Sequence, residues 1–175
     1  MIDWRLESIA RHHKRDSFDC GDDALNAYLR RYARRNHDLG VSRTLVAVPD
    51  SDPVTILGYF TLSPAAIDYH LVPDSVAHRL PKYDVPVYRL GRLAVDQAQQ
   101  GVGQGAQLLL AAGSTCIKAS MHAGGVAMLI DARNESVAGW YLRFGALPLI
   151  NQPLTLIIRL DLIAEALAAR DTPPV

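Results

Sequence analysis

The sequence has little cysteine, no long apolar run and no net charge. Only Cys20 and Cys116 occur among its 175 residues, and two distant cysteines cannot form the disulfide framework of a small secreted domain, so we expect both to be reduced. A run of about 18 apolar residues, which a membrane span needs, is absent. Residues 1–16 are too charged for a signal peptide. These features predict a cytoplasmic protein without membrane contact.

Metal-binding patterns are missing as well. The six histidines show no HExxH or other ligand spacing, so we expect no metal site. Equal numbers of basic and acidic side chains, 18 of each, remove any argument from overall basicity for binding nucleic acid. Any nucleic-acid surface must therefore come from a local concentration of basic residues.

The strand and helix patterns predict a mixed α/β sheet in a single domain over residues 1–175, with a frayed tail at 171–175. Two strands joined by a short turn form a hairpin in the first half, and three further strands alternate with helices in the second half. The predicted strands are residues 42–50, 55–67, 86–95, 126–132 and 153–162. This order favours a mixed sheet over a doubly wound one.

Helices are predicted between these strands from the 3.6-residue apolar period and from capping residues. One begins at Asp22 or Asp23 and runs to about His37, and its outer face carries Arg30, Arg31, Arg34 and Arg35. The others run from the glycine-rich segment to about residue 120, from about residue 134 to a stop near Gly145, and over the C-terminal residues.

Three glycines at alternate positions, Gly101, Gly103 and Gly105, stand where a strand gives way to a helix. A helix N-terminus offers unpaired backbone N–H groups and partial positive charge, and glycine lets the backbone approach a phosphate closely. For a single such glycine, a tight strand-to-helix turn is the favoured interpretation. Three of them, preceded by Gln100, favour a cradle for a phosphate or pyrophosphate.

Two nucleotide-site patterns compete for this segment. Residues 101–106 satisfy the dinucleotide fingerprint GxGxxG/A, and Asp131 ends the next strand about where a ribose-binding acid is required. That fingerprint needs its first glycine almost directly after the strand, whereas residues 96–100 intervene here. The P-loop sequence GxxxxGK[ST] is absent. An NAD-binding oxidoreductase stays open as an alternative.

Residues 100–105, Gln-Gly-Val-Gly-Gln-Gly, resemble the Q/R-x-x-G-x-G/A motif of the GNAT (Gcn5-related) N-acetyltransferases. The preceding residues 93–96, Leu-Ala-Val-Asp, resemble the strand end that leads into this motif. A second segment, from Asn134 through Trp140 and Tyr141 to Gly145, resembles the second landmark of the family. Ala146 departs from the phenylalanine of many members, which we expect to affect packing more than chemistry.

The resemblance implies a GNAT acyl-CoA N-acyltransferase fold and acetyl-CoA as co-substrate. In that family the loop amides hold the pyrophosphate of coenzyme A and the backbone of the preceding strand meets its pantetheine arm. The coenzyme-binding residues implied are Leu93, Ala94, Val95, Gln100, Gly101, Val102, Gly103, Gln104, Gly105, Ala106 and Asn134. The resemblance also places the Tyr141 hydroxyl near the coenzyme sulfur, where it would protonate the leaving thiolate. A tyrosine simply packed beside Trp140 is the alternative.

Four further segments resemble the GNAT toxins of bacterial toxin–antitoxin modules: residues 18–21, 25–29, 57–63 and 86–95. Those toxins acetylate the α-amino group of aminoacyl-tRNA, block translation and are neutralised by a small ribbon–helix–helix antitoxin. The resemblance thus implies these partners, and it is compatible with a homodimer. A GNAT enzyme for a small amine or a protein N-terminus, and a non-catalytic module that binds coenzyme A, stay as alternatives.

The pattern of charged residues agrees with an α-amine acceptor and an RNA partner. The strand at 86–95 offers no carboxylate as general base, and an α-amine with a pKa near 8 needs a base less than a lysine near 10.4. The tRNA-binding residues we expect are Arg30, Arg31, Arg34, Arg35 and Arg92. A solvated face, or one that meets an acidic antitoxin, is the alternative for the four helix arginines.

Overall fold

The computed structural model describes residues 2–171 and arranges seven strands in one mixed sheet, which confirms the predicted α/β class. The strand order is β1-β2-β3-β4-β5-β7-β6. Strands β4 and β5 are parallel, whereas the β1/β2, β2/β3, β5/β7 and β6/β7 pairs are antiparallel. The strands are β1 (Trp4–Ser8), β2 (Arg43–Pro49), β3 (Gly58–Ile67), β4 (Val85–Val95), β5 (Ala127–Asp131), β6 (Leu147–Leu149) and β7 (Gln152–Arg159).

Helices fill the connections between the strands. The α-helices are α1 (Asp23–Arg31), α2 (Ala33–Asp38), α3 (Asp74–Ala77), α4 (Gln104–Ala123), α5 (Glu135–Leu142) and α6 (Leu160–Asp171). Two short 3₁₀ helices, η1 (Tyr69–Leu71) and η2 (Gln97–Gln99), lie in the loops before β4 and before α4. No helix among the described residues has the length and apolar character that a membrane crossing requires.

The described chain divides into two compact units, residues 2–63 with 91–111 and residues 64–90 with 112–171. Strands β3 and β4 and helix α4 contribute residues to both units. The single domain expected from chain length stays a prediction. The candidate site residues are distributed over both units.

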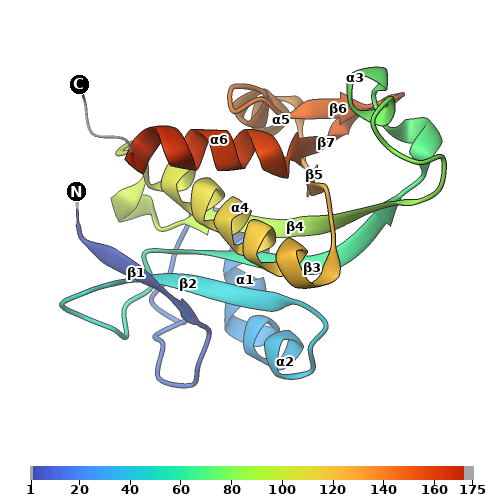
Figure 1. The fold of residues 1–175 in the computed structure, drawn as a ribbon. Helices are drawn as coiled ribbons and strands as arrows, with labels where there is room; N and C mark the ends of the chain where they lie inside the picture. Colours follow the sequence, from blue (N-terminus) through green and yellow to red (C-terminus); the bar gives the residue numbers. More distant parts are fainter. Residues whose placement is uncertain (1, 172–175) are drawn as a thin grey trace. The chain divides into compact units, whose positions relative to one another are not determined.

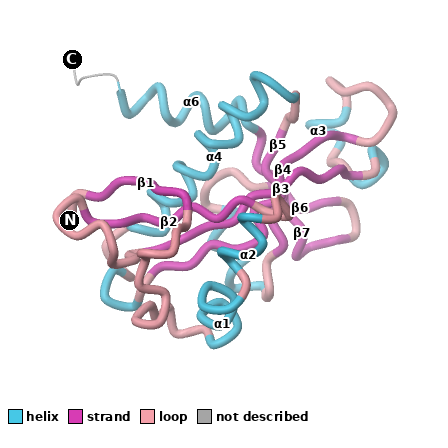
Figure 2. The backbone as a smooth tube through the Cα atoms, turned by 90° about the horizontal axis from the view of Figure 1, so that it is seen from below, coloured by secondary structure: helices cyan, strands magenta, loops and turns pink. Residues whose placement is uncertain are grey.

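The first unit is built on an aromatic core beneath its strands. The Tyr59 ring of β3 stacks on the Tyr28 ring of α1 at a centroid distance of 6.5 Å, and it meets Phe18 edge-on at 5.6 Å. The Tyr59 hydroxyl donates a hydrogen bond of 2.8 Å to the carbonyl oxygen of Leu25. Strands β1 and β2 lie side by side (Figure 2), and α1 and α2 lie on one side of them (Figure 1). Burial of this aromatic face fixes α1 on the sheet.

The second unit has an aliphatic core around β5. Residues Ala127 to Ile130 of β5 are all buried, as expected for an interior strand between β4 and β7. Helix α6 continues directly from β7 (Figure 1) and packs closely on α4. A Cβ at Gly113 of α4 would lie 2.6 Å from Cγ2 of Ile163 in α6, so this contact requires glycine.

The structure differs from the sequence expectations in several places. The strand expected over residues 153–162 ends at Arg159, and α6 begins at Leu160. The helix expected from Asp22 to His37 is broken at Tyr32, whose φ of −119° ends α1 before α2 begins. Strands β1 and β6 were not expected from the sequence. Asp171, the first residue of the tail expected at 171–175, is the last residue of α6, and residues 172–175 lie outside the described residues.

Candidate functional site

The glycine loop has the backbone of an anion site. Gly101 and Gly103 take φ values of +78° and +88°, a left-handed conformation that favours glycine, and no atom lies within 4 Å of a Cβ built on either. Helix α4 begins at Gln104, and the Gln107 N–H donates to the Gly103 carbonyl at 3.2 Å. The three preceding N–H groups, of residues 104–106, therefore have no helical acceptor. The loop residues fit a pyrophosphate at this helix N-terminus.

Two side chains of the loop differ in their surroundings. Val102 is 52% exposed, whereas Gln104 is 2% exposed. The Gln104 Nε2 is a buried donor without a hydrogen-bond partner among the described residues. A buried unpaired amide costs free energy. An anionic ligand at the backbone N–H groups of residues 104–106 would therefore lie next to Gln104, whose Nε2 is this unpaired donor.

The strand end before the loop is packed tightly in the first unit. Ala94 is buried, and Leu93 and Val95 are half-buried. A Cβ at Gly58 of β3 would lie 2.9 Å from the Ala94 carbonyl oxygen and 2.5 Å from Leu108 Cδ1. Gly58 therefore allows β3, the end of β4 and the first turns of α4 to pack against one another. This packing holds the loop between two anchored elements.

Gln100 is engaged by the protein itself. Its Nε2 donates to the carbonyl oxygens of Cys20 and Val95, both at 2.9 Å. The side-chain amide therefore ties the start of the loop to the end of β4 and to the segment before α1. This arrangement favours a role for Gln100 in positioning the loop over direct contact with a phosphate.

Asn134 and Tyr141 lie in the second unit. The Asn134 Oδ1 accepts a hydrogen bond of 2.9 Å from the Val137 N–H, so Asn134 is the N-cap of α5, and Tyr141 lies in the last turn of this helix. The Tyr141 ring packs edge-on against Trp140 at 4.9 Å. Among the described residues, none forms a hydrogen bond with the Tyr141 hydroxyl. Burial raises the pKa of Tyr141 to about 12, so the hydroxyl holds its proton at neutral pH.

The four helix arginines lie on α1 and α2, on either side of Tyr32. Arg30, Arg31 and Arg35 are exposed and Arg34 is half-buried, and none of the four forms an ion pair with a described residue. Arg92 of β4 contacts helix α1. Its guanidinium stacks over the Tyr28 ring, 3.5 Å from the ring centroid. The four helix arginines therefore stay candidates for contact with an anionic ligand, with Asp16 and Asp23 beside Arg30 and Arg31.

Asp131 is already paired. Its carboxylate forms an ion pair with the Arg89 guanidinium within the second unit. A ribose-binding acid needs free carboxylate oxygens, so this pairing counts against the dinucleotide-binding interpretation. The hairpin-first strand order counts against it too.

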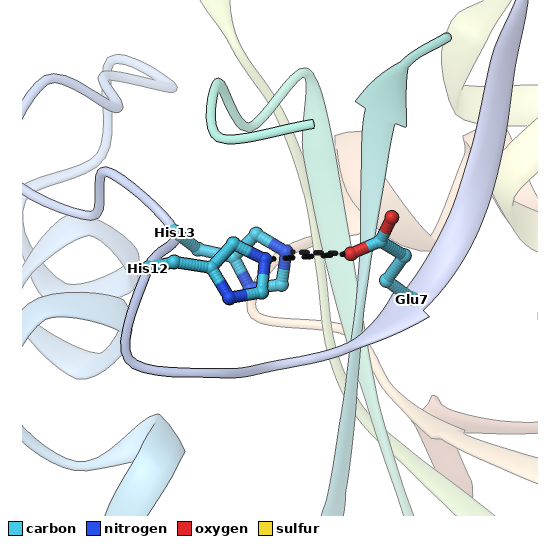
Figure 3. A group of neighbouring side chains, drawn as sticks. All are labelled: Glu7, His12 and His13. Atoms are coloured by element: carbon cyan, nitrogen blue, oxygen red, sulfur yellow. Dashed lines mark hydrogen bonds and ion pairs between the residues drawn. The ribbon is translucent and has the colours of Figure 1, made fainter. Parts of the chain in front are cut away.

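Sequence patterns did not indicate one further cluster, formed by Glu7, His12 and His13 (Figure 3). The Glu7 Oε2 lies 3.1 Å from His13 Nε2 and 3.6 Å from His12 Nε2. The Ala10 N–H donates to His13 Nδ1 at 2.9 Å, so a neutral His13 carries its proton on Nε2 and donates it to Glu7. A metal would need that nitrogen unprotonated. The contacts therefore favour a hydrogen-bonded cluster over a metal site.

The cluster predicts an acid-labile fold. Burial lowers the pKa of His13, and the hydrogen bond that His13 donates to the Glu7 carboxylate opposes this shift. Below the ordinary histidine pKa of about 6.5, the His13 imidazole binds a proton in the unfolded chain but stays neutral in the folded chain. The free energy of unfolding therefore falls as the pH falls. We expect the free energy of unfolding in urea to be lower at pH 5.5 than at pH 7, with a smaller decline in His13→Gln. The exposed-site variant His122→Gln should decline like the parent; equal declines in all three proteins would contradict the prediction.

No family model matches the chain, but individual proteins do. A tRNA-acetylating toxin of Mycobacterium tuberculosis is 34% identical over 128 residues, which are 73% of this chain and 75% of the relative. The chain belongs to this family of tRNA-acetylating toxins. The GNAT resemblance of the sequence is thereby confirmed, and the chain is an N-acetyltransferase by family.

Solved structures of such toxins share the fold. A tyrosine-to-phenylalanine mutant of KacT gives a TM-score of 0.86 at 30% identity, covering 93% of this chain and 98% of KacT. AtaT complexed with acetyl-methionyl-tRNAfMet gives 0.85 at 26% identity, covering 97% and 100%. An AtaT tyrosine-to-phenylalanine mutant bound to acetyl-CoA and the C-terminus of the antitoxin AtaR gives 0.80 at 26% identity, covering 94% and 98%. These matches confirm the GNAT fold for nearly the whole chain.

Proposed function

We propose that this chain transfers the acetyl group of acetyl-CoA to the α-amino group of an aminoacyl-tRNA and so blocks translation. The observation that carries the proposal is membership of the tRNA-acetylating toxins together with an open glycine loop that fits a pyrophosphate. AtaT, which shares the fold over 97% of this chain, is complexed with the acetylated product of this reaction on methionyl-tRNA. The substrate implies that the protein acts in the cytoplasm.

When bound, the coenzyme supplies an activated acetyl thioester. In this proposal the N–H groups of residues 104–106 hold its pyrophosphate, and the backbone of Leu93, Ala94 and Val95 aligns its pantetheine arm. The Tyr141 hydroxyl, protonated because burial raises its pKa, donates a proton to the departing thiolate. Asn134 contributes by capping the helix that carries Tyr141.

The acceptor amine needs little general-base catalysis from the protein. A lysine amine with a pKa near 10.4 is almost wholly protonated at neutral pH, whereas an α-amine near 8 is partly neutral. An aminoacyl-tRNA can therefore react without a dedicated carboxylate base, and strand β4 offers none over Val85–Val95. This chemistry favours an α-amine over a lysine side chain.

Transfer itself is tested in a single turnover. Purified protein, acetyl-CoA and a mixture of charged tRNAs should give acetyl-aminoacyl ester, recovered after hydrolysis as the N-acetyl amino acid. Uncharged tRNA and a lysine-rich peptide serve as acceptor controls and should stay unmodified. Acetylation of the peptide with no product on charged tRNA would overturn the proposed substrate.

The four helix arginines supply the tRNA contact in this proposal. Changing the exposed pair Arg31 and Arg35 to alanine should weaken tRNA binding and flatten the slope of log affinity against log salt by about 0.7 to 0.9 for each phosphate that the variant no longer neutralises. The control removes two charges elsewhere, Lys118 and Arg170, and should keep the parent slope. Filter binding across a salt series measures both. An unchanged slope in the first variant would assign this face to solvent or to an antitoxin.

We further propose that a small antitoxin of the ribbon–helix–helix type neutralises this chain. The support is the family membership and the AtaT structure, in which the toxin is bound to the C-terminus of its antitoxin. A short neighbouring reading frame with that fold would identify the partner. A homodimer and the lack of a metal requirement also stay predictions, to be checked by light scattering and by activity after chelation.

A further inference from the structure

We infer that Asn26 and Asp19 position the acetyl-CoA loop, by clamping residues 18–21 between α1 and the residues that lead into the loop. The inference rests on the proposed binding of acetyl-CoA at residues 101–106. It gives residues 18–21, which are far from the loop in sequence, a role in positioning the loop. It also connects the helix that carries Arg30 and Arg31 with the coenzyme site.

We call Asn26, Asp19 and the hydrogen bonds that they form with residues 20, 96 and 97, together with the hydrogen bond from Gln100 to Cys20, the clamp. Asn26 is its buried residue. It lies in the first turn of α1 and is 3% exposed. Its Oδ1 accepts from the Cys20 N–H at 3.0 Å, and its Nδ2 donates to the Asp19 Oδ1 at 2.8 Å. Both ends of the side-chain amide are therefore used to hold the segment before α1.

Asp19 connects the segment held by Asn26 to the residues that precede the loop. Its N–H donates to the Asp96 Oδ2 at 3.1 Å, and its carbonyl oxygen accepts from the Gln97 N–H at 2.8 Å. Its carboxylate also accepts from the Gly21 N–H at 2.8 Å, the contact that does most to lower the pKa of Asp19. The carboxylate is thus ionised at neutral pH and is a strong acceptor for the Asn26 amide.

The last connection reaches the loop itself. Gln100, one residue before Gly101, donates from Nε2 to the Cys20 carbonyl as well as to the Val95 carbonyl. Residues 96–100 are therefore tied at both ends to the segment that Asn26 holds. The two left-handed glycines follow at once, in a stretch where built Cβ atoms would meet nothing within 4 Å. Because the surroundings of Gly101 and Gly103 restrain them little, the geometry of the loop depends on the hydrogen bonds that hold residues 96–100.

This role separates coenzyme affinity from turnover. A loosened clamp leaves the loop N–H groups in place but spreads them over more conformations, so binding of the coenzyme must restore order. Once the coenzyme is bound, the geometry at Tyr141 is unchanged. We therefore expect clamp variants to raise KM and Kd for acetyl-CoA while kcat at saturating acetyl-CoA is kept.

The test is Asn26→Asp, which keeps the shape and the acceptor for Cys20 but places a carboxylate 2.8 Å from that of Asp19. We expect the Kd for acetyl-CoA, measured by calorimetry, to rise about tenfold, with KM rising equally and kcat staying within about twofold. The matched control is Asn36→Asp in α2, whose amide contacts the Tyr28 hydroxyl at 3.4 Å and not the clamp. Its Kd for acetyl-CoA should equal that of the parent.

A rescue variant excludes a general loss of structure. Combining Asp19→Asn with Asn26→Asp removes the repulsion between the two carboxylates, but the Asp19 Oδ1 position, which accepts from both the Asn26 amide and the Gly21 N–H, can then satisfy only one of these partners. The Kd should therefore fall below that of Asn26→Asp alone without reaching the parent value. If Asn26→Asp does not fold, Gln100→Ala at the exposed end of the clamp tests the same connection and should also raise the Kd about tenfold.

Three results would overturn the inference: an unchanged Kd in folded Asn26→Asp or Gln100→Ala, a fall in kcat at constant KM, or a double variant no better than Asn26→Asp alone. The calorimetry needs no acetyl acceptor. A parent protein that binds acetyl-CoA but leaves charged tRNA unmodified would therefore overturn the proposed substrate and leave this test intact.

Discussion

Replacing Tyr141 by phenylalanine should lower the rate of acetyl transfer to charged tRNA by about 10²- to 10⁴-fold, the usual contribution of a general acid. The ring keeps its edge-on packing against Trp140, and the lost hydroxyl has no hydrogen-bond partner among the described residues, so the fold should be unaffected. Single-turnover kinetics with saturating acetyl-CoA measures the effect. Growth arrest on expression should disappear with the activity.

The control for this result is Tyr83→Phe, the same change at a tyrosine that is 67% exposed, which should react at the parent rate. The Kd for acetyl-CoA should be similar in both variants and in the parent. A parent-like rate in Tyr141→Phe would mean that the tyrosine only packs in α5 and that the proton comes from another donor.

The pH profile gives a second view of Tyr141. Because burial raises its pKa to about 12, ionisation of the hydroxyl cannot reduce the rate between pH 6 and pH 10. The rate should instead rise with pH as the acceptor amine, with a pKa near 8, loses its proton, and then level off. A decline before pH 10 in an otherwise stable protein would point to a different acid.

Replacing Gly103 by valine should weaken acetyl-CoA binding by about 100-fold or more. A β-branched residue at a φ of +88° is strained, and the loop must change course to relieve that strain. Relaxation moves the N–H groups of the following residues away from the position where they converge on an anion. Calorimetry with acetyl-CoA, on protein shown to be folded by circular dichroism, measures the loss.

Gly40 provides a matched control for this loss. It has a φ of +74° and, like Gly103, nothing lies within 4 Å of a built Cβ, but it belongs to the turn before β2. Gly40→Val should carry a similar backbone strain with no effect on the coenzyme. Equal affinity in both glycine variants would show that the loop is not the pyrophosphate site.

The sequence was a good guide wherever the role of a residue depends on its near neighbours in the chain. Gly101 and Gly103 need a left-handed conformation, and Asn134 needs a helix to cap, so both features follow from local chemistry. The break at Tyr32 was missed because its ring continues the apolar period of α1, although its φ of −119° departs from the usual helical value. The Tyr32 side chain is 51% exposed, so burial in the core does not explain its position.

Contacts between distant segments could not be predicted from the sequence. The clamp joins residues whose separation in the chain ranges from 6 for Asn26 and Cys20 to 80 for Gln100 and Cys20. Strand β1 was missed because its five residues alternate only weakly between buried and exposed positions. Their place is set by pairing with β2, which local propensity does not encode.

The arginines of α1 and α2 are a local concentration of positive charge in a chain with no net charge. With 18 basic and 18 acidic side chains there is no monopole to draw a polyanion in from afar, so attraction depends on orientation and decays steeply with distance. At physiological ionic strength the screening length is about 8 Å, which confines the effect to the last approach. If the proposed tRNA contact is correct, the arginines therefore act only on encounters in which the tRNA already lies close to α1 and α2.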